Sequence, residues 1–140
     1  MTFLEALYGS QYYEIKQQGK DGNKGRLNGN LFLTTLIILF ITAVFLFCIR
    51  FVPGFNHYMT LQSRKFFGFS SGRSVGRILA IIMLIIIYVI INNTAGNAAN
   101  FKKKTEAFMQ YPDEIKKKAN VKLLTPFFIL LALVVALVIL

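Results

Sequence analysis

The sequence predicts an all-α membrane protein with three transmembrane helices, an N-terminal amphipathic interfacial helix and a helical cytoplasmic hairpin. The chain is 55% hydrophobic, which is high for a soluble domain of 140 residues. Its apolar residues are gathered into blocks that carry almost no charge, and these blocks cover residues 31–52, 78–91 and 123–140. About 20 apolar helical residues cross a hydrocarbon core of about 30 Å, so the first block is long enough on its own.

The blocks and the turn-forming segments between them divide the chain into six parts. They are an amphipathic helix with a glycine-rich linker (1–30), a first span (31–52), an aromatic and basic loop (53–65), a second span with a glycine strip at its start (66–93), a basic helical loop (94–122) and a third span (123–140).

The N-terminal segment has the pattern of a capped amphipathic helix. Thr2 and Glu5 have the spacing of a capping box, and Gly19 is placed to end the helix. Its apolar face needs either the lipid interface or a docking site on another subunit. The glycines that follow, Gly22, Gly25 and Gly29, predict a linker in which the backbone takes positive φ. The residues assigned to the interfacial face are Phe3, Leu4, Leu7, Tyr8 and Tyr12.

A strip of small residues opens the second span. Gly68, Gly72, Gly76 and Ala80 are four residues apart, so on a helix they form a line that another helix can approach closely. In the alternative interpretation, Gly68 and Gly72 lie in a loop and the helix begins near Ser74.

The third block contains Pro126, preceded by Thr125, a pair typical of a helix start. A helix that began there would cover only about 22 Å before Leu140. Three alternatives stay open: the helix starts upstream near Ala119 and bends at Pro126, it reaches only part-way, or the natural chain continues.

Basic residues indicate the orientation of the spans. Of the 16 lysines and arginines, eleven lie in the N-terminal tail and the second loop and five lie elsewhere. The positive-inside rule therefore predicts a cytoplasmic N-terminus and an outside C-terminus, in a bacterial inner membrane. Lysine runs beside a membrane indicate anionic phospholipid and disfavour nucleic acid. We expect contacts with this lipid or with a partner's acidic groups at Arg50, Arg64, Lys65, Arg73, Arg77, Lys102, Lys103 and Lys104.

The three blocks lack the groups on which reactions and ion pumping depend. They contain no Asp, Glu, Lys or His, and the whole chain has one cysteine, Cys48, and one histidine, His57. No phosphate-binding loop or Cys/His metal cluster is visible, so we predict neither an enzyme nor a bound metal or cofactor.

We expect a small non-catalytic accessory subunit of a larger inner-membrane complex of the respiratory, secretion or motor class, with other membrane subunits and anionic phospholipid as its partners. The alternative is a small homo-oligomeric transporter or channel. Its pore mouth would lie near Tyr88, Asn92, Asn93 and Thr94.

Overall fold

The computed structural model describes residues 1–67 and 72–140, with the side chains at 63, 64 and 66–76 outside this description, and the described residues contain helices and no strands. The elements are α1 (Phe3–Gln17), the short 3-10 helix η1 (Gly22–Lys24), α2 (Gly25–Phe51), α3 (Phe55–Phe67), α4 (Gly72–Asn93), α5 (Ala98–Met109), α6 (Asp113–Lys117) and α7 (Ala119–Ile139).

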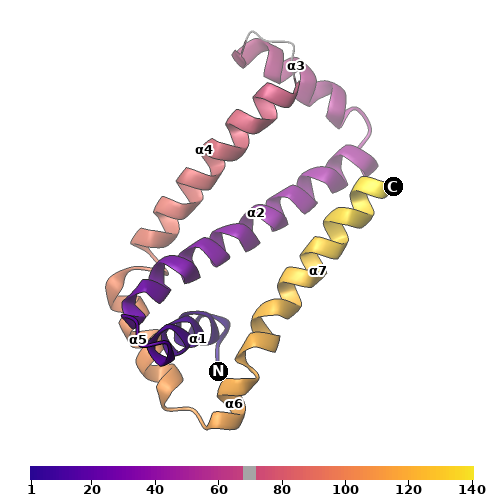
Figure 1. Cartoon of the computed structure of the whole chain (residues 1–140). Helices are drawn as coiled ribbons and strands as arrows, with labels where there is room; N and C mark the ends of the chain where they lie inside the picture. The colour runs from indigo at the N-terminus through magenta and orange to yellow at the C-terminus, as the bar shows by residue number, and fades with distance from the viewer. Residues whose placement is uncertain (68–71) are drawn as a thin grey trace.

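The long helices α4, α2 and α7 lie side by side with α2 in the middle (Figure 1). Helices α4 and α2 come together at the end of the molecule where α1, α5 and α6 gather, α2 and α7 come together near the C-terminus, and α3 lies at the end away from α1. Two segments, Gly22–Phe51 and Asp113–Ile139, are long and apolar enough to cross a membrane. One more span, which would bring the total to three, is counted if Arg77–Asn93 and Ala98–Met109 form a single crossing; these two helices meet at a bend of 68°. The prediction of a helical protein with helices long and apolar enough to span a membrane is therefore confirmed.

Both predicted ends of α1 are confirmed. The Glu5 N–H donates to Thr2 Oγ1 at 3.2 Å, and the Thr2 N–H donates to Glu5 Oε2 at 2.9 Å, which completes the capping box. At the other end Gly19 has φ +75°, and the N–H of Lys20 donates to the carbonyl of Ile15. This is the left-handed glycine stop that the sequence predicts.

Glu5 also connects α1 to the segment after α5. The hydrogen bond from the Thr2 backbone, opposed by partial burial, holds the pKa of Glu5 below its ordinary value of 4.5. The Tyr111 hydroxyl donates to the same carboxylate at 2.9 Å, which helps to lower that pKa and raises the pKa of Tyr111. The N-terminal cap is therefore also a tertiary contact.

The apolar face of α1 is covered by this chain itself. Leu7 and Tyr8 are fully buried, and they share a core with Phe101 and Phe108 of α5. The expectation that Leu7 and Tyr8 meet lipid or another subunit is therefore wrong, because α5, α2 and α7 supply the covering surface. We call the packed end formed by α1, η1, α5, α6 and the first turns of α2 and α7 the head. Partly buried residues of α1 also pack on its core, among them Phe3, Leu4 and Tyr12.

Helix α2 begins at Gly25, six residues before the predicted span, because its glycines allow close contact with α1. A Cβ on Gly25 would lie 2.9 Å from the backbone of Gln11, and one on Gly29 would lie 2.6 Å from the ring of Tyr8. Neither glycine has positive φ. The linker interpretation is therefore wrong at these positions, where a missing side chain is what the helix crossing requires.

Two other segments differ from their predicted forms. Residues 53–65, expected as a loop, are helical from Phe55, after Gly54 makes the turn from α2 with φ +77°. At the third span, α7 runs through Pro126 from Ala119, so the helix starts upstream of the proline and not at Thr125. Thr125 is inside this helix, and its hydroxyl donates to the Val121 carbonyl at 2.6 Å.

Candidate functional site

A buried polar network joins the head to the ends of α2 and α4. The Tyr8 hydroxyl donates to Asn30 Oδ1 at 2.7 Å. The Asn30 amide donates to Asn92 Oδ1 and to the Gly96 carbonyl, each at 3.3 Å. Arg26 donates from Nε to that carbonyl at 2.7 Å and from Nη2 to Asn92 Oδ1 at 3.1 Å. We call Tyr8, Arg26, Asn30, Asn92 and Gly96 the polar junction.

The polar junction fixes the positions of the helices that it joins, and its groups are not arranged to transfer protons. Asn30 is fully buried, and every buried side-chain nitrogen or oxygen among the described residues has a hydrogen-bond partner. Burial raises the pKa of Tyr8 to about 12, although the Arg26 charge acts in the opposite direction. Tyr8 therefore keeps its proton at neutral pH and remains a donor to Asn30. A satisfied buried network of this kind favours one arrangement of the helices that it joins.

Gly96 allows the junction to close. It lies in the turn between α4 and α5, and a Cβ at this position would overlap the side-chain amide of Asn30. The absence of a side chain lets the Gly96 carbonyl reach both Arg26 and Asn30.

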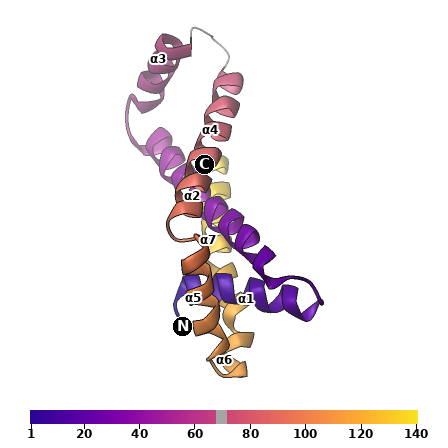
Figure 2. The ribbon, with the colours of Figure 1, turned by 90° about the vertical axis from the view of Figure 1, so that its left-hand side faces the viewer.

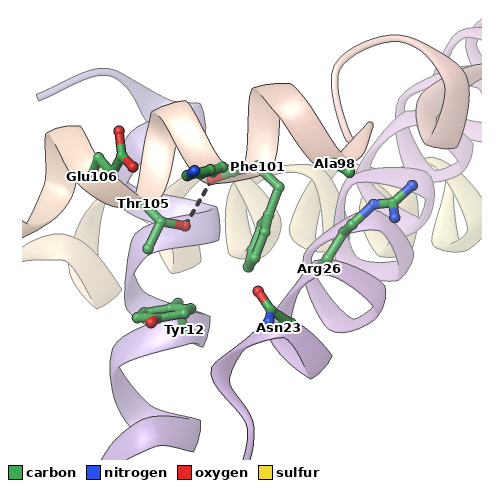
Figure 3. A pocket seen from close by; sticks show the side chains of 8 residues that line it. Tyr12, Asn23, Arg26, Ala98, Phe101, Thr105 and Glu106 are labelled. Carbon is green, nitrogen blue, oxygen red and sulfur yellow. Dashed lines mark hydrogen bonds between the residues drawn. The ribbon is translucent and has the colours of Figure 1, made fainter.

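Beside the junction lies an open pocket of about 530 Å³ between the end of α1, η1, the start of α2 and α5. Figure 3 shows the rings of Tyr12 and Phe101 facing the pocket, with Arg26 at its rim next to Ala98. The two rings meet edge to face at 6.2 Å between centroids. The lining residues are Tyr12, Asn23, Arg26, Ala98, Phe101, Lys102, Thr105 and Glu106.

A smaller pocket of about 170 Å³ adjoins the first, since both are lined by Asn23 and Arg26. It lies between α2 and α4, and its other lining residues are Leu27, Asn30, Tyr88 and Asn92. Arg26 is therefore shared by the polar junction and by both pockets.

The predicted glycine strip is partly within the described residues. Gly68 lies outside them, whereas Gly72, Gly76 and Ala80 belong to α4, which begins at Gly72 and not near Ser74. Ala80 is exposed, so none of the described helices covers the strip there. Packing of another helix on this strip stays a prediction.

The residues predicted to make charge contacts lie in different parts of the molecule. Arg50 donates to the carbonyls of Leu137 and Val138 in the last turn of α7, at 3.2 and 3.1 Å, so its partner is in this chain. This contact suits the helix dipole. Lys65 of α3 and Arg77 of α4 are exposed, and the side chains of Arg64 and Arg73 lie outside the described residues.

The basic residues of α5 differ in their surroundings. Lys102 and Lys103 are exposed, Lys104 is partly buried, and only Lys102 lines the main pocket. The sequence interpretation included Lys102 but did not single out Arg26, Asn30 or Gly96 as site residues. A signal for Asn30 exists in retrospect, because it is a polar residue at the edge of a long apolar block.

Comparison of the chain with protein-family models, with curated proteins and with solved structures finds no match.

Proposed function

We propose that this protein is a small non-catalytic accessory subunit of a larger inner-membrane complex, and that it acts by holding three spanning helices in a fixed arrangement for partner subunits to pack against. The observation that carries the proposal is the contrast between a densely packed head and sparsely packed spans. The head buries Leu7, Tyr8 and Phe108 almost completely, whereas α4 and α7 expose most of their large apolar side chains.

The spans form a layer only one helix thick. Helix α2 packs against α4 on one flank and α7 on the other (Figure 1). In the side view of Figure 2, α2 runs obliquely across α4 and α7. The faces on both sides of such a layer are open to lipid or to helices of other subunits. Close packing of apolar helices is a main source of association inside a bilayer.

The ends of the molecule support the proposed orientation. The N-terminus and the basic helices α5 and α6 lie together at one end, and the C-terminus lies at the opposite end beside α2 (Figure 1). In this proposal α4 crosses the membrane as α2 and α7 do, and the head with Lys102, Lys103 and Lys104 lies on the cytoplasmic side, as the positive-inside rule requires.

One observation favours the alternative, a homo-oligomeric transporter or channel. Tyr88 and Asn92 line the small pocket between α2 and α4, and this pocket adjoins the larger one in the head. Polar groups at the end of a spanning pair are what an entry site for a solute would need.

Photo-crosslinking from the exposed face of α4 tests these proposals. A benzoyl-phenylalanine in place of Ile85, which is 55% exposed, should capture polypeptides of discrete mass that differ from this chain. The matched control is the same residue in place of Ile91, which is 4% exposed and should give only intrachain products. Adducts from Ile85 that contain only copies of this chain would favour the transporter, and adducts with lipid alone would contradict both.

A further inference from the structure

We infer that the main pocket of the head, together with the adjoining small pocket, binds the headgroup of one anionic membrane phospholipid. The main pocket is lined by two cationic side chains, Arg26 and Lys102, and by one carboxylate, Glu106, which leaves one net positive charge. A phosphodiester carries one negative charge, so the pocket and the headgroup are complementary. A guanidinium also binds the oxygens of a phosphate through pairs of parallel hydrogen bonds.

Arg26 is held in place before any ligand arrives. Its Nε and Nη2 donate to the Gly96 carbonyl and to Asn92 Oδ1, so the plane of the guanidinium is fixed by the polar junction. These bonds use only part of the donor capacity of the group, and no other acceptor for it is found among the described residues. A fixed donor loses less side-chain entropy on binding than a mobile one.

The site lies at the depth of lipid headgroups if the spans are placed as proposed above. Arg26 precedes the first residue of the apolar block, Leu31, by five residues, or about 7.5 Å along a helix. The headgroup region on each side of the hydrocarbon core is about 5 to 8 Å thick. A phosphate bound at Arg26 would therefore lie at the level where phospholipids carry it.

The lining of the two pockets suits a lipid headgroup. Asn23 and Thr105 offer polar contacts in the main pocket, and Tyr12 and Phe101 offer an aromatic wall. The volume of about 530 Å³ is within the range of small-molecule sites. The small pocket extends this site from Arg26 between α2 and α4, and the amide side chains of Asn23, Asn30 and Asn92 line it as further polar contacts for the headgroup.

The test is a pair of matched lysine variants. Lys102 and Lys103 are neighbours on α5 and both are exposed, but only Lys102 lines the pocket. The purified chain is placed in phosphatidylcholine nanodiscs, and the binding of phosphatidylglycerol is measured by native mass spectrometry. Lys102→Ala should weaken binding about fivefold, whereas Lys103→Ala should leave it nearly unchanged. Equal losses in the two variants would show a diffuse surface charge effect and would overturn the site.

Glu106→Gln should change phosphatidylglycerol binding in the opposite direction, because Glu106 is the one acidic residue among the described residues that line the pocket. It should strengthen phosphatidylglycerol binding, and weaker or unchanged binding would contradict the proposal. The melting temperatures of the three variants are measured alongside. None of the three side chains has a hydrogen bond or ion pair among the described residues, so all should fold like the parent chain.

A second experiment shows whether the ligand of the site is a lipid or a soluble phosphate compound. Inorganic phosphate is added to the same nanodiscs, and it should displace phosphatidylglycerol only weakly. Saturation of the site by inorganic phosphate, with no preference for the lipid, would overturn the lipid assignment. The measurement uses the isolated chain, so it stands or fails separately from the capture of partner subunits.

Discussion

Gly96→Ala is expected to lower the free energy of unfolding by about 3 to 5 kcal/mol. The new methyl group would overlap the amide of Asn30, which is fully buried and bonded to Tyr8. Forced overpacking costs about 1 to 3 kcal/mol, and each buried polar group left without a partner costs a similar amount. The measurement is unfolding of the chain in mixed micelles, followed by circular dichroism.

Two controls show whether this loss arises at the polar junction. Asn93→Ala changes an exposed residue at the end of α4 and should change stability by less than about 0.5 kcal/mol. In an Asn30→Ala background there is room for the methyl group, so Gly96→Ala should cost at least about 1 kcal/mol less than in the parent chain. Equal costs in the two backgrounds would mean that Gly96 and Asn30 do not touch.

Gly9→Ala is expected to loosen the contact between α1 and α5, at a cost of about 2 to 3 kcal/mol. A Cβ on Gly9 would overlap the ring of Phe108, which is 1% exposed at the centre of the head. The ring cannot move away without opening the core that it shares with Leu7 and Tyr8. The amides of α1 should then exchange with solvent faster, as hydrogen exchange with mass spectrometry would detect.

Its matched control is Gln17→Ala, also on α1, because Gln17 is exposed. This variant should leave the exchange of α1 close to that of the parent chain. Protection of α1 that survives Gly9→Ala unchanged would contradict the packing of α1 on α5.

Local features of the chain could be predicted from the sequence because their causes are local. The cap of α1 at Thr2 and its end at Gly19 depend on residues within one helical turn of each other. The apolar blocks likewise predict the long helices α2 and α7 from composition alone. The start of α2 could not be predicted, because a glycine can serve either a backbone with positive φ or a close contact between helices. The role of Gly25 is visible only in the folded chain, where it lies against the backbone of Gln11.

The candidate site could not be predicted because it depends on residues far apart in the sequence. Arg26 and Gly96 are 70 positions apart, and they meet only because α2 and α4 lie side by side. An amphipathic pattern shows that a face of α1 must be covered, but it does not identify the cover. Lipid, another subunit and α5 all satisfy the same pattern, and only the packing of Tyr8 on Phe101 distinguishes them.

The central claim is that the chain is a subunit whose partners cover its exposed spans. The most direct test is native mass spectrometry of the affinity-tagged full chain, released from its own membrane in polymer-bounded nanodiscs without detergent. The account predicts one particle that contains this chain and other polypeptides in a fixed ratio. A particle that contains only this chain, alone or as a closed oligomer, would contradict the accessory role.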